Sequence, residues 1–180
     1  MLNNSHRYGA LSISMHWLMV LLLVAVYACI ELREFYPKGT DTREAFKQWH
    51  FMLGLSVFLL VWLRLILRVA QVQPVIEPAP PVWQERFAKI VQLALYLLMM
   101  GMPVAGWLIL SAAGKPVPFY GWELPALIAE NTDTAELIEE IHETVGTVGY
   151  ALIALHAVAA LYHHYILRDD TLRRMLPQRD

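Results

Sequence analysis

The sequence of 180 residues is 57% hydrophobic and only 17% charged, with a formal net charge of −2 at pH 7. This apolar share exceeds that of ordinary soluble domains and predicts an integral membrane protein, for which we expect no nucleic-acid partner. The single Cys29 can form no disulfide within the chain, and the sequence has no cysteine-based metal site or c-type haem attachment motif. Any metal is therefore expected to be held by histidine.

Four apolar stretches are long enough to cross a bilayer as helices. They cover about residues 12–32, 46–69, 86–110 and 140–166. We predict an all-α fold, an integral membrane four-helix bundle that forms a single domain over residues 1–180. Nine of the fourteen lysines and arginines lie before the first span, around the second connection or in the tail. The positive-inside rule then predicts that both termini are cytoplasmic.

The first span carries His16 near its inner end and follows Arg7. A cleavable secretory signal with a weak processing site at residues 26–29 is an alternative. The length of the apolar run and the three spans that follow favour a retained helix. In the second span, His50 lies near the outer end and Arg64 follows fourteen residues later. On a helix this spacing brings both to one face, about 21 Å apart in depth, where Arg64 can neutralise an anionic group. Snorkelling to lipid phosphate is the alternative and is favoured for Arg68.

Four prolines predict that the inner connection, residues 71–83, is extended, and the third span has no histidine. The outer connection, residues 111–133, mixes glycine and proline with aromatic residues and predicts a lid or a binding segment. Asp133 followed by Glu136 predicts the start of the last helix. This helix carries His142 and His156, and fourteen residues separate them by about −40° and 21 Å.

Because consecutive spans alternate in direction, the four histidines pair by depth. His50 and His142 are expected near the outer surface, and His16 and His156 near the inner surface. Two facing neutral imidazoles suit a planar tetrapyrrole, whereas zinc or copper would need a third or fourth clustered ligand. The pattern favours two bis-histidine haems that relay single electrons over a set of purely structural histidines. A haem propionate is then the natural anion for Arg64.

His163 competes with His156 for the inner site, since it lies on nearly the same face. It would, however, lie about 31 Å from His142, essentially the whole thickness of the hydrocarbon core. His156 is therefore the expected ligand. His163 and His164 then lie at the cytoplasmic interface, where a titratable pair can exchange protons with a quinone. Contact with lipid headgroups beside Arg168 is the alternative.

Several segments in chain order resemble the bacterial cytochrome b561 family, and the resemblance covers nearly the whole chain. They are Arg7-Tyr8, Ser12 to Leu18, Trp49-His50 with Gly54, Arg64 with Arg68, His142-Glu143-Thr144, Gly149-Tyr150, His156-Ala157, His163 to Tyr165, and Asp169 to Met175.

The resemblance implies a multi-pass diheme cytochrome b of the bacterial inner membrane, with two haems b and ubiquinone as substrate. It implies His50 and His142 as ligands of the outer haem, and His16 and His156 as ligands of the inner one. The superoxide oxidase type of the family would make the chain an oxidoreductase that oxidises periplasmic superoxide to dioxygen and reduces ubiquinone. In that case it needs membrane lipids and small molecules but no protein partner.

Attraction of an anionic donor to the acidic outer side would depend on a few basic residues, namely Arg33, Lys38, Arg43, Lys47 and Lys115. An alternative function is a cytochrome b anchor that links a peripheral dehydrogenase or hydrogenase to the quinone pool. A structural bundle without haem is a third reading, and it predicts a colourless protein.

Overall fold

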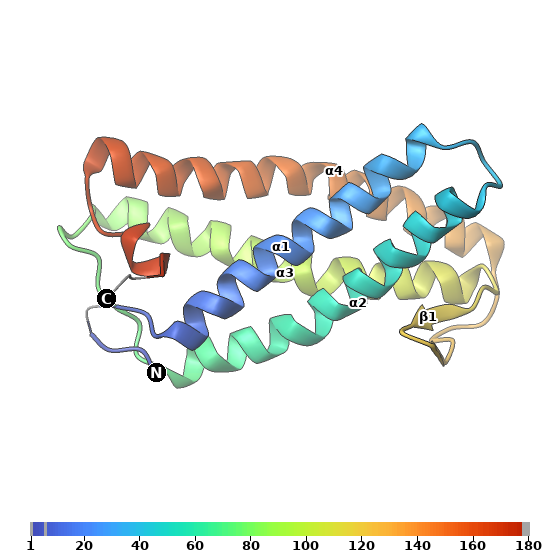
Figure 1. Ribbon diagram of the computed structural model, residues 1–180, viewed down its shortest axis with the longest axis horizontal. Helices are drawn as coiled ribbons and strands as arrows, with labels where there is room; N and C mark the ends of the chain where they lie inside the picture. The colour runs from blue at the N-terminus through green and yellow to red at the C-terminus, as the bar shows by residue number, and fades with distance from the viewer. Residues whose placement is uncertain (1, 6, 178–180) are drawn as a thin grey trace. The chain divides into compact units, whose positions relative to one another are not determined.

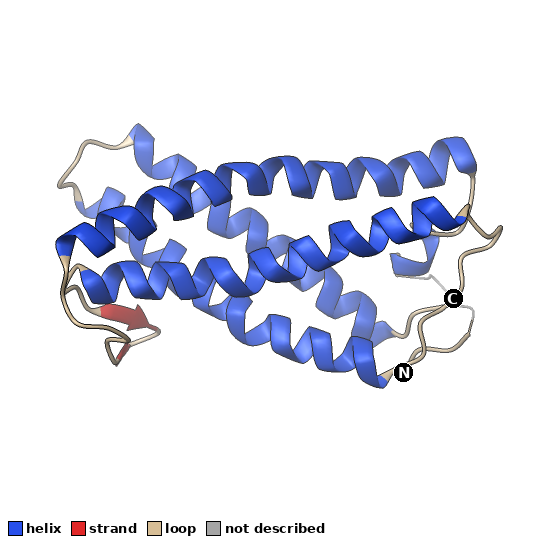
Figure 2. Cartoon of the chain, turned by 180° about the vertical axis from the view of Figure 1, so that it is seen from behind, coloured by secondary structure: helices blue, strands red, loops and turns tan. Residues whose placement is uncertain are grey.

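The computed structural model describes residues 2–5 and 7–177. These contain the helices α1 (Ala10–Leu32), α2 (Asp41–Ala70), α3 (Val82–Ala112) and α4 (Thr132–Tyr162) (Figure 1). The 3-10 helix η1 (Arg33–Phe35) follows α1, the π-helix η2 (His163–Leu167) continues α4, and the 3-10 helix η3 (Arg173–Met175) lies in the tail. The strands β1 (Val117–Phe119) and β2 (Trp122–Leu124) pair as an antiparallel hairpin (Figure 2). The expectation of a chain dominated by four long helices is confirmed.

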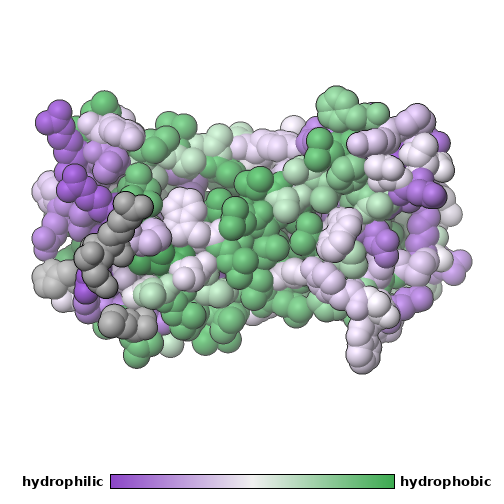
Figure 3. All heavy atoms as spheres, viewed as in Figure 1, coloured by the Kyte–Doolittle hydropathy of each residue, from purple (hydrophilic) through white to green (hydrophobic). Residues whose placement is uncertain are grey.

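Each long helix is sufficiently long and apolar to cross a membrane. The candidate spans are Ala10–Phe35, Asp41–Ala70, Val82–Ala112 and Thr132–Leu167. Many of their large apolar side chains are exposed, among them Leu21, Ile66 and Leu97, as expected for helix surfaces that face lipid. On the face drawn in Figure 3, apolar side chains cover the middle of the helices and hydrophilic side chains gather toward the ends.

The chain divides into two compact units. The first, called here the terminal unit, consists of the described residues within 1–18, 62–97 and 148–180. The second, called the hairpin unit, consists of residues 19–61 and 98–147. Every long helix contributes one segment to each unit, so α4 supplies His142 to the hairpin unit and His156 to the terminal unit.

The hairpin was not predicted from the sequence. Its strand residue Val117, 2% exposed, packs with Leu55 of α2 and Leu110 of α3 in the core of the hairpin unit. The two residues of its turn, Tyr120 and Gly121, have positive φ values of 46° and 89°, as a type I′ turn requires. Gly121 adopts this conformation without strain, whereas Tyr120 needs external support.

Three contacts provide that support for Tyr120. Its hydroxyl lies 3.0 Å from Ser56 Oγ, and its backbone N–H points at the sulfur of Met52, with an N···S distance of 3.4 Å. Since the Ser56 hydroxyl already donates to the carbonyl of Met52, the tyrosine is the donor to Ser56. The ring of Tyr120 also meets Trp49 edge to face, at 6.5 Å between centroids. The hairpin tip is thus fixed on α2 beside His50.

The outer end of α3 stops at Gly114, which has φ +63°. The N–H of Lys115 donates to the carbonyl of Leu110 and that of Gly114 to Ser111, the pattern of a Schellman cap. A Cβ at Gly114 would lie 2.6–2.9 Å from the carboxyl group of Glu130. The backbone conformation therefore favours glycine, whereas the close contact alone could be relieved by movement of the flexible Glu130 side chain.

Helix α4 begins one residue earlier than Asp133. The cap is Asn131, whose side-chain oxygen accepts a hydrogen bond from the N–H of Thr134 at 2.8 Å. Asn131 is itself held by its N–H, which donates to the carbonyl of Ala112 at the end of α3. The predicted start at Asp133 was therefore displaced by a contact with a residue distant in the sequence.

In the terminal unit, the N-terminal segment, the inner connection and the tail are fastened together. As predicted, the connection forms no helix from Gln71 to Pro81, but the prediction was wrong for Val82 and Trp83, because α3 begins directly after Pro81. Asn3 bonds to the backbone of Val72, and Asp170 exchanges two hydrogen bonds with the backbone of Glu77. Arg174, 8% exposed, donates to the carbonyl of Pro74 at 2.6 Å. The carbonyls of Pro74 and Glu77 in this connection thus bind the tail.

Candidate functional site: two histidine pairs

The first histidine pair lies in the hairpin unit. His50 of α2 and His142 of α4 have ring centroids 6.3 Å apart and ring planes at 72°. His50 is on the buried stripe of α2, where Val57 and Val61 are 2% and 0% exposed. The buried face of α2 and the facing side of α4 therefore bring the two imidazoles together, as the depth pairing predicted.

Each histidine of this pair keeps a ring nitrogen that is available to bind a metal. Nδ1 of His50 lies 3.0 Å from the carbonyl oxygen of Val26, so Nδ1 carries the hydrogen and Nε2 keeps its lone pair. Nδ1 of His142 is buried and has no hydrogen-bond partner among the described residues. A Cβ on Gly54, one turn from His50, would meet no atom within 4 Å. Space therefore lies on the face of α2 that carries His50.

The second pair lies in the terminal unit and has nearly the same geometry. His16 of α1 and His156 of α4 have ring centroids 6.3 Å apart and ring planes at 69°. Trp17 meets His16 edge to face at 5.4 Å, and its indole N–H donates to the backbone carbonyl of Met175 at 2.7 Å. The tail is thus connected to the ligand pair through one tryptophan.

Arg64 contacts this second pair directly. Its Nη2 lies 3.1 Å from Nδ1 of His16. A guanidinium can only donate, so in this contact Nδ1 accepts and the hydrogen of the neutral ring is on Nε2. Binding of a metal through Nε2 requires the opposite tautomer. His16 would therefore lose its contact with Arg64 if it held a metal through Nε2, and Arg64 would need another acceptor.

Both pairs fit one metal between two imidazoles. A metal–imidazole bond of about 2.0–2.1 Å, and about 1.2 Å from the bound nitrogen to the ring centre, give about 6.4 Å between centroids on opposite sides of a metal. The observed 6.3 Å agrees for each pair. Within the described part of the chain, no group of three or more His, Cys, Asp or Glu side chains is arranged to hold a metal ion. Two imidazoles without a third protein ligand would fit an iron that a tetrapyrrole ring already holds.

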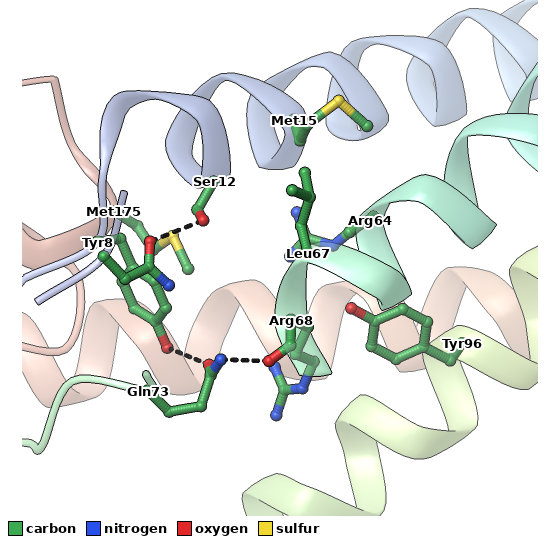
Figure 4. A pocket seen from close by; sticks show the side chains of 10 residues that line it. Tyr8, Ser12, Met15, Arg64, Leu67, Arg68, Gln73, Tyr96 and Met175 are labelled. Atoms are coloured by element: carbon green, nitrogen blue, oxygen red, sulfur yellow. Dashed lines mark hydrogen bonds between the residues drawn. The ribbon is translucent and has the colours of Figure 1, made fainter. Parts of the chain in front are cut away.

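Arg64 and Arg68 line one cavity of the terminal unit (Figure 4). Arg68 donates to Gln92 at 2.7 Å and lies over the ring of Tyr96. The backbone carbonyl of Arg68 accepts a hydrogen bond from the side chain of Gln73 at 2.6 Å. The hydroxyl of Tyr96 is buried and has no hydrogen-bond partner among the described residues. The cavity thus offers two cations and an available hydroxyl to an oxygen-rich anion. Sequence reasoning had identified both arginines but not Tyr96.

His163 and His164 lie in η2, where α4 changes from α- to π-helical bonding. Nδ1 of His163 is 2.5 Å from Oδ2 of Asp169, which is 4% exposed. His164 packs against Tyr165, with ring centroids 4.8 Å apart, and its buried Nδ1 has no hydrogen-bond partner among the described residues. Sequence reasoning had found both histidines but had not assigned a role to Asp169.

Asp169 is ionised over a wide pH range because its hydrogen bonds outweigh its burial. Burial raises the pKa of this carboxyl group, whereas hydrogen bonds from His163 and from Thr171 lower it, and the net pKa lies below the ordinary value. One oxygen faces His163 and the other accepts the N–H of Thr171 at 2.9 Å. Asp169 therefore stands beside His163 as a carboxylate.

Most of the basic residues expected to attract an anionic donor are neutralised. Arg43 is 7% exposed and forms a bidentate contact with Glu34, at 2.8 and 3.0 Å. Arg33 bonds to the same carboxylate, and Lys47 pairs with Glu44. Three of the five basic residues are thus paired with two carboxylates, which offset most of their charge locally.

Comparison with known proteins identifies the family of the chain. Residues 7–178 match the family model of prokaryotic cytochrome b561. The chain is 37% identical to "Cytochrome b561 homolog 1" of Escherichia coli K12, over 97% of this chain and 99% of that protein. It is 33% identical to "Probable superoxide oxidase CybB" of Yersinia pestis, over 96% and 97% of the two chains. It is also 30% identical to "Cytochrome b561 homolog 2" of Escherichia coli K12, over 97% and 93%. The chain therefore belongs to the prokaryotic cytochrome b561 family, whose members are multi-pass bacterial membrane oxidoreductases that transfer electrons through haem b.

Proposed function

We propose that the protein is a diheme cytochrome b of the bacterial inner membrane that takes electrons from periplasmic superoxide and reduces ubiquinone. Residues 1–180 form one membrane domain in this proposal, with both termini in the cytoplasm. The observation that carries it is the repetition of one geometry, two imidazoles with centroids 6.3 Å apart, in two separate units. One pair alone would suit an isolated metal site, whereas two pairs suit a relay.

His50 and His142 hold the outer haem, and His16 and His156 hold the inner one. Haem b, when bound between each pair, supplies one-electron oxidation and reduction. The protein side fixes the axial ligands: the carbonyl of Val26 orients the ring of His50 and increases its basicity. With two histidines at each site, the protein would leave no position for oxygen at the metal and would favour electron transfer over oxygen binding.

Arg64 and Arg68 bind the negative charges that the inner cofactor brings. Haem carries two propionates, which must be neutralised where they enter a weakly polar environment. If His16 held a metal, Arg64 would lose its acceptor on that ring, and it lines the cavity that it shares with Arg68. The two guanidiniums would then be available to carboxylate oxygens, and Tyr96 lines the same cavity.

The identity of the outer donor is supported by the relative named as a probable superoxide oxidase. Two superoxide anions each lose one electron and leave as dioxygen, while one ubiquinone gains two electrons and two protons and becomes ubiquinol. Since Glu34 and Glu44 offset nearby basic residues, the outer side gives little long-range attraction to an anion. The donor rate should therefore depend only weakly on ionic strength.

His163 and His164 serve the quinone at the inner side. They belong to the same unit as the inner histidine pair, and each imidazole has a ring nitrogen that can donate or accept a proton. His163→Ala should keep both haems and impair quinone reduction. Loss of one haem in this variant would instead make His163 a ligand.

The test of the function uses the purified protein alone, mixed with superoxide and a soluble ubiquinone. We expect consumption of superoxide with formation of one ubiquinol for two superoxide anions. If ubiquinol forms only when a peripheral dehydrogenase or hydrogenase subunit is added, the chain is an anchor subunit and requires a protein partner. Bovine serum albumin at equal mass controls for non-specific protein effects on the spontaneous reaction.

A further inference from the structure

The carboxylate of Asp169 is buried and contacts His163. At 4% exposure it is one of the most buried acidic groups among the described residues, and both of its oxygens are used. Oδ2 lies 2.5 Å from Nδ1 of His163, and Oδ1 accepts the N–H of Thr171 at 2.9 Å. The side chain therefore cannot turn away without breaking both of these hydrogen bonds.

An unusual helix end brings Asp169 next to His163. The π-helix η2 ends at Arg168, whose φ of +57° places it in the left-handed region. The N–H of Asp169 then donates to the carbonyl of His163 at 3.2 Å, so backbone and side chain of one residue both bind the same histidine. π-helical turns often occur at functional sites, and strained residues persist only where surrounding contacts hold them.

The following tail residues hold this turn in place. Asp170 exchanges hydrogen bonds with the backbone of Glu77 at 3.0 and 3.1 Å, and it also pairs with Arg174 at 3.3 Å. Asp169 and Asp170 are thus adjacent carboxylates with different partners. The first faces a histidine, and the second fastens the tail to the inner connection.

The chemistry of the contact decides which nitrogen of His163 can react. An ionised carboxylate only accepts hydrogen bonds, so Nδ1 of His163 carries a hydrogen and Nε2 is the nitrogen that gains or loses a proton. A carboxylate at Nδ1 also stabilises the imidazolium that forms when Nε2 is protonated. The ring is therefore oriented and made a better proton carrier by the same bond.

We propose that Asp169 is a positioning residue that makes His163 the proton donor to the reduced quinone, an inference that rests on the proposed function. As the quinone receives its electrons, the Nε2–H bond of the His163 imidazolium breaks and an O–H bond forms on a quinone oxygen. The neutral ring keeps its Nδ1–H bond to Asp169. Water on the inner side returns a proton to Nε2, and the second quinone oxygen takes its proton from water.

The kinetic test compares Asp169→Asn with Asp170→Asn, which removes the same charge from the adjacent residue. We expect kcat for soluble ubiquinone to fall at least about 10-fold in Asp169→Asn, with KM changed by no more than about twofold. Asp169→Glu, which keeps a carboxylate, should recover part of the rate. Asp170→Asn should stay within about twofold of the wild type, and the visible spectra of all variants should be unchanged.

A second readout does not depend on turnover. Nitrogen-15 NMR of histidine-labelled, reduced protein reports which nitrogen of His163 carries the hydrogen, with His163→Gln used to assign the signal. The wild type and Asp170→Asn should have the Nδ1–H form, whereas an asparagine at position 169 can present its NH₂ group to Nδ1 and favour the Nε2–H form.

The possible outcomes distinguish this inference from the proposed function on which it rests. Equal kcat in the wild type and Asp169→Asn, or an Nε2–H tautomer in the wild type, would overturn the positioning role and leave the function intact. A wild-type protein that cannot reduce quinone would overturn the function and the proton-donor role together. The tautomer measurement would in that case still report whether Asp169 orients His163.

Discussion

Replacing Arg64 by Met removes a positive charge beside His16 and should lower the reduction potential of the inner haem. Ferrous haem carries one positive charge less than ferric haem, so a neighbouring cation favours the reduced state. Methionine has a similar length and fills similar space, which limits the change to the charge and its hydrogen bonds. Arg64→Lys keeps the charge and serves as the matched control.

The magnitude follows from the distance. Arg64 Nη2 is 3.1 Å from Nδ1 of His16, and an iron on the opposite ring nitrogen would lie about 4 Å further. Allowing the guanidinium to retreat into the cavity gives a charge separation of about 7–10 Å. At an effective dielectric constant of about 20, this corresponds to about 1.7–2.4 kcal/mol, or about 70–100 mV for one electron.

An optical redox titration resolves the two haems as two midpoint potentials. We expect one potential to fall by several tens of mV up to about 100 mV in Arg64→Met, because a propionate partly compensates the lost charge. The other potential should stay unchanged, and Arg64→Lys should shift the first by less than half as much. Equal shifts of both potentials, or no shift in either, would refute the placement of Arg64 beside one haem only.

Variants at three positions, Gly106, Tyr27 and Asp169, test the geometry. Gly106→Ala should be tolerated, because its Cβ would lie 3.6 Å from Cε1 of His142, whereas Gly106→Leu should displace this ring and remove about half of the haem, as measured by absorbance per protein. Tyr27→Phe loses the hydrogen bond to the carbonyl of Gly146 at 2.9 Å and should lower the unfolding free energy in detergent by about 0.6–1.7 kcal/mol. An unchanged unfolding free energy would show that this hydrogen bond does not stabilise the fold. Because the pKa of Asp169 is lowered in the folded protein, its carboxylate stabilises the fold above about pH 4 and this contribution is lost as pH falls through the folded pKa. Asp169→Asn should therefore be less stable than wild type by about 1.5–3 kcal/mol at pH 7 and approach it below pH 4, and a gap independent of pH would contradict the ionised state.

The sequence allowed the long helices and both histidine pairs to be predicted, because hydrophobic length and helical period are local properties. Fourteen-residue spacing on one helix and alternation of direction were sufficient to match His50 with His142 and His16 with His156. The structure brings both pairs together at 6.3 Å. That these four histidines hold haem is a proposal. Their pairing, in contrast, could be predicted from the order of the spans alone.

Features that depend on contacts between distant segments were missed. Strands of three residues show no usable alternation, and a turn made by Tyr120 and Gly121 lacks the usual Asn-Gly signal, since Ser56 on α2 stabilises the tyrosine. The start of α4 was placed at Asp133, whereas the contact of Asn131 with Ala112 selects the earlier cap. Each error arose where a tertiary hydrogen bond chose among local options of similar propensity.

Asp169 could not be recognised from spacing alone. It follows His163 by six residues, which on a regular α-helix would put the two side chains on different faces. The π-helical turn and the left-handed Arg168 bring them together, and neither can be read from the residue types. The only local signal was the segment Asp169 to Met175, which belongs to the family resemblance. Tyr96 likewise gave no signal, because its role depends on the cavity that Arg64 and Arg68 share with it.

The most direct test of the account is the number of haems b per chain, measured from the pyridine haemochrome and the protein concentration. The account predicts two in the wild type and one in each of His142→Ala and His156→Ala, with different midpoint potentials for the haem that remains. A wild type that binds a single haem at full occupancy, or single variants that keep both haems, would contradict it.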